Sequence, residues 1–424
     1  MHSHMAVVTL DQVEDISIET EKAKQASDTL APRSNVVRRG FGLKSEIRET
    51  LISDYHSELV EKIKSQGHTL SVGRLTFKLA EEFGFCYGVD FALNLAYETR
   101  KQFPDKRIFL TNEIIHNPRV NSRLGEMGIE FIDCSADNPD RFTKVTADDI
   151  VMIPAFGAPI GEYESLKQKG CLVVDTTCGS VIAVWKRVEK YAKEGFTAII
   201  HGKHVHEETQ ATSSQTAKYE SGTYLIVYDK QEAAYVCRYI VEGGDRAEFL
   251  KRFADACPAG FDPDRDLARV GLANQTTMLS SESLEIAEMF REAIERRYGA
   301  EAAADRFRHF DTICSATQDR QDAVIKLVRQ DLDLMIIIGG YNSSNTGHLA
   351  EISVLHKPAF HINESGCILS ASLIRHKPVG ELEEVVTEGW LPDGDITIGV
   401  TAGASTPDRI VGEVIDRIVN CCMV

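Results

Sequence analysis

Short apolar runs alternate with amphipathic segments along most of the chain, and this alternation restricts its possible folds more than any other feature. The apolar runs predict buried strands at 106–110, 149–153, 171–174, 197–200, 334–338 and 396–400. Each is followed by a polar or glycine-containing loop and then by a segment with a helical period. That order is typical of βαβ units, in which helices connect parallel strands. The sequence therefore predicts an α/β fold with mostly parallel sheets.

The length of the chain predicts several domains. Its 424 residues are enough for about two to four domains of ordinary size. We expect an N-terminal extension over 1–72, because these residues are polar and carry no cluster of candidate catalytic side chains. Three lobes are expected at 73–178, 179–312 and 313–424. The segment near 213–266 is rich in Tyr, Glu, Asp and Gly and interrupts the alternation, which indicates an insertion in the second lobe.

Three cysteines occupy the same local position in this pattern. Cys178 and Cys314 each end a sequence of the form Asp-Thr-x-Cys, Cys86 ends Phe-Gly-Phe-Cys, and a helical pattern follows each of them. The N-terminus of a helix favours a thiolate through its dipole and its free N–H groups. Three lobes could each bring one thiolate to a shared metal centre. Three unrelated buried cysteines at strand–helix junctions would give the same pattern.

A set of three thiolates restricts which metal groups are possible. It is too small for a four-cysteine zinc or iron–sulfur site. It suits a 4Fe–4S cluster with one open iron, or a zinc ion with one missing ligand. An open iron could bind a substrate hydroxyl and help to expel it. The remaining cysteines are expected to be non-ligands, and these are Cys134, Cys171, Cys237, Cys257, Cys367, Cys421 and Cys422.

Small polar residues follow several of the predicted strands. Ser343, Ser344 and Asn345 come after the run at 334–338, and Ser405 comes after the run at 396–400. His116 precedes an Asn-Pro pair that predicts a helix start. Small and hydroxyl side chains at such turns can bind phosphate, although each loop alone is also typical of a plain turn or cap. Together they favour a phosphate-bearing ligand.

A histidine-rich segment lies after the predicted strand at 197–200. His201, His204 and His206 could bind phosphate oxygens or hold a zinc ion, and Glu208 could move a proton. An exposed His- and Glu-rich turn without such a role is also common. Neutral hydrogen-bonding groups follow a further strand at 270–272, and these include Gln275 and Thr276.

The charge balance restricts the partners. With 47 Lys plus Arg against 64 Asp plus Glu, the net charge is −17, which argues against a nucleic-acid binder. We find no apolar run of about 18 residues and no signal or transit peptide, so we expect no membrane partner. We expect a cytoplasmic protein, or one of the plastid stroma if the source is a photosynthetic eukaryote.

Eight sequence blocks occur in the order of one known family. They are GFCYGVDFA, EIIHNPRV, VDTTCGSV, HGKHVHEETQAT, NQTTM, DTICSATQDRQDAV, NSSNTGHLAEI and GVTAGASTPD, and they span 84–408. On these motifs the chain resembles the LytB/IspH family, in particular its plant and cyanobacterial branch. The resemblance implies three αβα lobes in a pseudo-threefold arrangement around a central iron–sulfur cluster.

The resemblance also implies roles for individual residues. The family's three ligands of a 4Fe–4S cluster correspond to Cys86, Cys178 and Cys314, with the fourth iron open. Its substrate-diphosphate contacts correspond to His116, His206, Ser343, Ser344, Asn345 and Ser405. Glu208 matches the acid that delivers protons, and Thr276, with Gln275 beside it, matches the threonine that orients the substrate hydroxyl.

The implied reaction is the reductive dehydroxylation of 4-hydroxy-3-methylbut-2-enyl diphosphate to isopentenyl and dimethylallyl diphosphate, the last step of the methylerythritol phosphate pathway. The electron donor expected for the family is a ferredoxin or a flavodoxin. The cysteines alone would also allow a cluster-dependent hydro-lyase, a zinc hydrolase acting on a phosphorylated substrate, or a non-enzymatic iron–sulfur sensor.

The chain departs from the family pattern at one position. Many bacterial members carry a histidine in the loop that follows the strand at 151–153, where this chain has Phe156. A phosphate-facing donor is therefore missing, or Lys203 or His204 replaces it.

Overall fold

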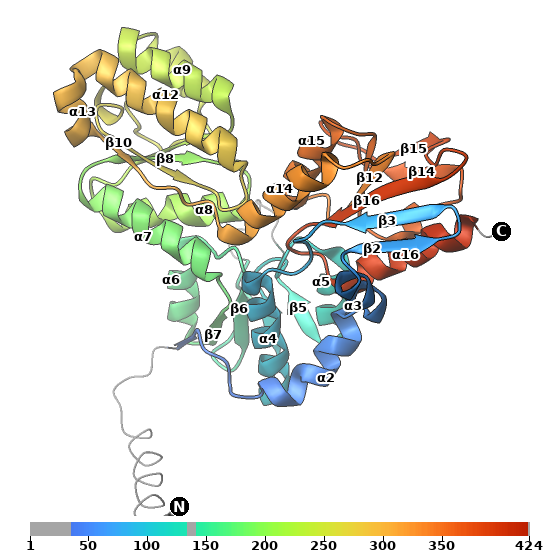
Figure 1. The fold of residues 1–424 in the computed structure, drawn as a ribbon. Coiled ribbons are helices and arrows are strands. Elements are labelled where there is room, and N and C mark those ends of the chain that lie inside the picture. Colours follow the sequence, from blue (N-terminus) through green and yellow to red (C-terminus); the bar gives the residue numbers. More distant parts are fainter. Residues whose placement is uncertain (1–34, 134–140, 423–424) are drawn as a thin grey trace, which may run out of the picture.

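The structure, a computed structural model, describes residues 35–133 and 141–422. Within these ranges the chain forms three lobes, each built around its own sheet (Figure 1). Residues 1–34 of the expected N-terminal extension, and Cys134, lie outside the described residues.

The first lobe contains a parallel sheet that is covered on both faces. Its strands are β1 (Val36–Val37), β4 (Ile108–Leu110), β5 (Ile129–Phe131), β6 (Ile150–Ile153) and β7 (Leu172–Asp175). They lie in the order β1-β7-β6-β4-β5. The central strand β6 reads Ile-Val-Met-Ile and is buried throughout, as expected for a strand covered on both sides. The helices of this lobe are α2 (Lys44–Tyr55), α4 (Tyr87–Gln102), α5 (Pro118–Glu126) and α6 (Ile160–Lys169).

The second lobe is also built on a parallel sheet. Its strands are β8 (Thr197–His201), β9 (Tyr224–Val227), β10 (Val270–Asn274) and β11 (Phe307–His309), in the order β11-β10-β8-β9. Its helices are α7 (Gly179–Lys193), α8 (Glu207–Ser214), α9 (Lys230–Glu242), α10 (Arg246–Arg252), α11 (Pro263–Asp266), α12 (Ser280–Tyr298) and α13 (Ala300–Arg306), with a 3-10 turn η1 (Gln215–Lys218).

The third lobe combines residues 58–79 with the C-terminal part of the described chain. Its sheet contains β2 (Thr69–Val72), β3 (Leu75–Leu79), β12 (Leu334–Ile338), β13 (Ala359–Ile362) and β16 (Ile396–Ala402). The order is β13-β12-β16-β3-β2, and only the β2–β3 pair is antiparallel. A separate hairpin is formed by β14 (Leu373–His376) and β15 (Val385–Glu388). The helices are α3 (Glu58–Ser65), α14 (Ser315–Val328), α15 (Ser344–Val354) and α16 (Asp408–Cys422), with a 3-10 turn η2 (Ser365–Cys367).

The predicted α/β class with mostly parallel sheets is confirmed, and each predicted strand is present. Two expectations about organisation differ from the structure. The strand β3 was expected in the first lobe, but it hydrogen-bonds with β16, and the blue and red strands lie side by side in Figure 1. The segment near 213–266 is an integral part of the second lobe rather than an insertion. It supplies β9, which pairs with β8, and Phe249 and Phe253, which are buried in the core of that lobe.

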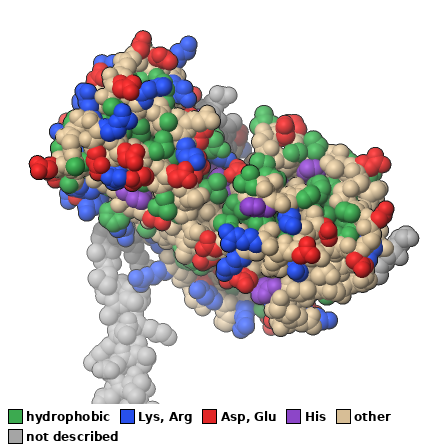
Figure 2. Space-filling view, turned by 45° about the horizontal axis from the view of Figure 1, so that its top comes forward, with side chains coloured by type: hydrophobic (Ala, Val, Ile, Leu, Met, Phe, Trp, Pro, Cys, Tyr) green, Lys and Arg blue, Asp and Glu red, His purple; other side chains and the backbone are tan. Residues whose placement is uncertain are grey.

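The surface carries charges of both signs. Figure 2 shows acidic and basic side chains interspersed over the face in view. No helix in the described ranges combines the length and the apolar character needed to span a bilayer.

Candidate active site

The three cysteines singled out in the sequence each begin a helix. Cys86 is the N-cap of α4, Cys178 of α7 and Cys314 of α14, and none of their side chains caps its own helix. The predicted strand–helix junctions are therefore confirmed. All three sulfur atoms therefore lie at the N-terminal ends of helices, where the helix dipole favours a negative charge.

The three helix starts meet at one pocket, called here the central pocket. Its cavity has a volume of about 110 Å³, and Cys86, Cys178 and Cys314 all line it. A Cβ atom on Gly88 would lie 2.5 Å from Cys178 Sγ and 3.8 Å from Cys86 Sγ. Because Gly88 has no side chain, the sulfur atoms of Cys86 and Cys178 can both lie close to its Cα atom.

Burial opposes the thiolate form of these cysteines. It raises the pKa of the Cys314 thiol to about 11, against a weaker opposing hydrogen bond from Thr317, and it also raises the pKa of Cys178. A buried thiolate therefore needs a cation in contact with it, which a metal group supplies. Three soft sulfur donors in a buried pocket fit an iron–sulfur cluster or zinc better than magnesium or calcium.

A buried arginine lies between two of the cysteine junctions. The Arg320 guanidinium donates to the carbonyl oxygens of Gly84 and Ala316, each at 2.7 Å, and to that of Phe85 at 3.2 Å. These carbonyl groups lie within two residues of Cys86 or Cys314. Arg320 therefore joins the backbone just before Cys86 to the first turn of the helix that Cys314 begins.

His116 lies in the loop between β4 and α5 and lines the central pocket. Its Nδ1 atom is 3.1 Å from Glu113 Oε2, and its Nε2 atom is 3.5 Å from Glu207 Oε2. The ring of Phe156 stacks on the imidazole, with the ring centroids 4.9 Å apart. The residue that departs from the family pattern thus contacts His116 and does not offer a polar donor.

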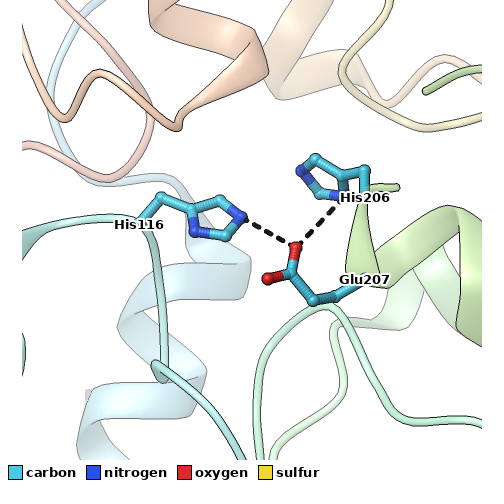
Figure 3. A group of neighbouring side chains, drawn as sticks. All are labelled: His116, His206 and Glu207. Atoms are coloured by element: carbon cyan, nitrogen blue, oxygen red, sulfur yellow. Dashed lines mark ion pairs between the residues drawn. The ribbon is translucent and has the colours of Figure 1, made fainter. Parts of the chain in front are cut away.

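His206 is the N-cap of α8, and its ring meets that of His116 edge-on at 5.1 Å (Figure 3). Its Nδ1 atom accepts a hydrogen bond from the backbone N–H of Glu208 at 3.1 Å. Burial lowers the pKa of His206 to about 3, so the ring is neutral near pH 7. With Nδ1 acting as an acceptor, the proton of the neutral ring is on Nε2.

Glu208 and Thr276 form a buried pair in the same pocket. Thr276 donates to the Glu208 carboxylate from its backbone N–H at 2.6 Å and from its hydroxyl at 2.9 Å. Burial raises the pKa of Glu208 to about 7, and the bonds from Thr276 partly oppose this shift. Such a group can release and take up a proton at neutral pH.

The third lobe adds neutral polar groups. Ser343 is the N-cap of α15, with Ser344 and Asn345 in the first turn, and Ser405 donates to the His116 carbonyl oxygen at 3.3 Å. Asn345 Oδ1 accepts from Ala404 N at 2.9 Å. Its Nδ2 atom is buried without a hydrogen-bond partner among the described residues. A helix start with small hydroxyl residues and a spare amide donor is well suited to an anion.

Gln275 does not line the central pocket, unlike the other predicted site residues. Its side-chain oxygen accepts from Lys203 N and Thr209 Oγ1, each at 3.1 Å. Its amide nitrogen donates to Thr277 Oγ1 at 2.9 Å and to Ser344 Oγ at 3.1 Å. Gln275 therefore connects the second and third lobes behind the pocket.

The structure does not support two of the alternatives that the histidine-rich segment left open. Lys203 and His204, the possible replacements for the bacterial histidine, do not line the central pocket. The alternative zinc set is not brought together, because His201 is fully buried in β8 with Nδ1 2.8 Å from Ser283 Oγ, while His204 is exposed. A histidine at the buried end of a strand packs with its neighbours instead of facing the pocket.

Two carboxylates near the pocket were not predicted. Glu113 and Glu207 flank His116, and Glu207 lies close to both imidazoles (Figure 3). The only signal for Glu113 in the sequence is its place three residues before a histidine. None of the other cysteines in the described ranges lines the pocket.

Comparisons with known proteins match this chain to one family over most of its length. A family model described as LytB protein matches residues 77–419. The 4-hydroxy-3-methylbut-2-enyl diphosphate reductase of Thermosynechococcus vestitus is 51% identical over 391 residues, covering 92% of this chain and 96% of the relative. The enzyme of the same name from Gloeobacter violaceus is 51% identical over 388 residues, covering 91% and 92%.

A solved structure resembles the fold. It is the E-1-hydroxy-2-methyl-but-2-enyl-4-diphosphate reductase from Plasmodium falciparum, with a TM-score of 0.58 and 22% sequence identity. The match covers 80% of this chain and 86% of that chain, and it supports the lobed α/β fold alone. The family model and the two cyanobacterial relatives span most of the chain, and on this basis the chain belongs to the LytB family.

Proposed function

We propose that this chain is an iron–sulfur oxidoreductase that converts 4-hydroxy-3-methylbut-2-enyl diphosphate to isopentenyl and dimethylallyl diphosphate. The observation that carries the proposal is the composition of the central pocket. It joins three cysteines at helix starts, a buried acid and a set of phosphate-type donors in one cavity. The names of the relatives support the same activity.

Cys86, Cys178 and Cys314 would hold a 4Fe–4S cluster with three protein ligands. When bound, such a cluster supplies electrons and a Lewis-acidic iron that can accept the substrate hydroxyl. The three half-buried cysteines at one pocket and the room that Gly88 leaves beside two of their sulfur atoms fit this group.

The diphosphate would bind where the three lobes meet. His206 offers a neutral Nε2–H donor, and Asn345 offers a buried amide N–H without another partner. His116, Ser343, Ser344 and Ser405 line the same pocket and add further donors. Because the donors come from all three lobes, they fix both the position and the direction of the substrate.

Glu208 would deliver the proton that the departing hydroxyl needs. Its carboxyl group is protonated in part of the molecules at pH 7, because burial raises its pKa to about 7. Thr276 holds both carboxyl oxygens and so positions the acid toward the pocket. Two electrons and one proton release water and leave an allylic anion, and a second proton added at one or the other end of the allylic group gives the two products.

The two electrons must come from a redox partner, for which we propose a ferredoxin or a flavodoxin. We also propose a cytoplasmic location, in keeping with the bacterial relatives. A zinc hydrolase is not favoured, because its expected ligands His201, His204 and His206 are not brought together.

The test is metal analysis followed by turnover. Protein purified without oxygen is expected to hold about four irons and four sulfides per chain, and to consume the allylic diphosphate only with a reduced dye. Cys178→Ser should lower the iron content, whereas Cys257→Ser, a cysteine away from the pocket, should not. Zinc without sulfide, or dehydration without reductant, would overturn the proposal.

A further inference from the structure

The carboxylate of Glu207 lies where two histidines of the central pocket face each other. Its Oε2 atom is 3.5 Å from His116 Nε2 and 3.9 Å from His206 Nδ1 (Figure 3). His116 belongs to the first lobe and Glu207 to α8 of the second, so this contact bridges two lobes. The carboxylate thus lies beside His116 and His206, the two side chains that bind the diphosphate under the proposed function.

His116 has a carboxylate on each side. Glu113 accepts from Nδ1, and the ring can donate from both nitrogens only when it is protonated. The Nε2 atom is buried and makes no hydrogen bond among the described residues, because 3.5 Å to Glu207 is too long for a good one. The Nε2 atom therefore remains available to a ligand with a better-placed oxygen, to which the ring donates in its protonated form.

The Glu207 carboxylate also has a hydrogen-bond partner other than the two histidines. Its Oε1 atom accepts a hydrogen bond from Asn112 Nδ2 at 3.2 Å, and its side chain is 34% exposed. It is also the first residue of α8, where the helix dipole stabilises a negative charge. The carboxylate can therefore turn away from the imidazole without losing all its partners.

A diphosphate oxygen on His116 Nε2 would carry a negative charge close to the Glu207 carboxylate. Two like charges at this distance repel each other, and partial burial makes the repulsion stronger than in water. The Glu207 carboxylate and the diphosphate therefore compete for the contact with His116 Nε2.

We infer that Glu207 is an internal competitor of the diphosphate, which sets its affinity, while Glu113 positions His116 to receive it. This inference rests on the proposed function, because it assumes that His116 binds the diphosphate. Glu207 occupies the contact with His116 in the free protein and, when the ligand arrives, turns away from the imidazole while it keeps its hydrogen bond from Asn112. The competition lowers affinity and, by the same interaction, speeds release of the product.

The experiment is a titration of inorganic diphosphate into the oxygen-free holoenzyme, measured by calorimetry. Glu207→Gln, which keeps the shape and removes the charge, should bind about three- to tenfold more tightly than the wild type. Glu207→Asp, whose shorter side chain reaches less far toward His116, should also bind more tightly. Glu113→Gln, the matched control on the other nitrogen, should bind more weakly. In turnover, KM should fall in Glu207→Gln by more than kcat changes.

The outcomes separate the inference from the proposed function. Unchanged or weaker binding by both Glu207 variants, with wild-type iron content, would overturn the competition and make Glu207 a second positioning group. A wild-type enzyme that binds no diphosphate at all would instead overturn the proposed function. If Glu207→Gln does not fold, Glu207→Asp decides, because the carboxylate and its helix-start position are kept.

Discussion

Replacement of Gly88 by alanine tests the arrangement of the cysteines most directly. Alanine favours a helix over glycine by about 1 kcal/mol, so the exchange alone would stabilise α4. However, the added Cβ would lie 2.5 Å from Cys178 Sγ and 3.2 Å from Cys178 Cβ. Ordinary contacts between such atoms are about 3.5–4.0 Å, so the sulfur would have to move by about 1 Å.

We expect Gly88→Ala to lower the free energy of unfolding only slightly but to lower the iron content strongly. Overpacking of this kind costs about 1–3 kcal/mol. The gain in helix propensity offsets part of it, which leaves a net loss of about 0–2 kcal/mol in the free energy of unfolding. A bound group tolerates displacements of only about 0.5 Å in its ligands, so we expect iron content to fall to about half or less.

The assay compares iron, sulfide and the unfolding temperature of three proteins purified without oxygen. The control is Gly179→Ala at the start of α7, beside Cys178, where an added Cβ meets no atom within 4 Å. This variant should keep wild-type iron content. A Gly88→Ala enzyme with full iron and full turnover would refute the reasoning, because the sulfur positions would then not matter.

Four further predictions concern the pocket. Glu208→Gln should still bind diphosphate but lower kcat by about 10²-fold or more, as measured in steady-state turnover. Burial raises the pKa of Glu208 to about 7, so the wild-type kcat should fall as pH rises through 7, since the acid loses its proton. The same raised pKa destabilises the fold progressively above the ordinary carboxyl range, so Glu208→Gln should have the higher unfolding temperature at pH 8. Asn345→Asp keeps the oxygen that accepts from Ala404 and adds a negative charge beside the diphosphate, so KM should rise about tenfold or more with little change in unfolding temperature. An unchanged KM in this last variant would remove Asn345 from the diphosphate site.

The strands of this fold could be predicted because their signal is local. Runs such as Leu334–Ile338 are apolar throughout, and the structure buries them on both faces. The partner of a strand is not a local property. Leu75–Leu79 pairs with Ile396–Ala402, more than 300 residues away. Neither run contains a sequence signal that identifies its partner strand. The run Tyr224–Val227 is apolar, as expected for a buried strand, but the polar residues around it indicated an insertion instead.

The candidate site divides in the same way. Cysteines at helix starts, and small polar residues after strands, leave a pattern in the sequence. Charged residues such as Glu113 and Glu207 do not, since a solvated turn has the same composition. Their position against His116 depends on how two lobes meet. The reverse error occurred at His201, whose place in a histidine-rich segment suggested a ligand while its strand buried it.

No single lobe contains the whole site, so the contacts between the lobes are part of the chemistry. Asn117 of the first lobe donates to the Ser405 carbonyl oxygen at 2.8 Å, and Gln275 of the second donates to Ser344 at 3.1 Å. Arg320 joins the helix that follows Cys314 to the backbone just before Cys86. Each of these polar groups is buried, and a buried donor left without its partner costs about 1–3 kcal/mol. The lobes are thus held in the one arrangement that brings the three sulfurs and the phosphate-type donors into the same pocket.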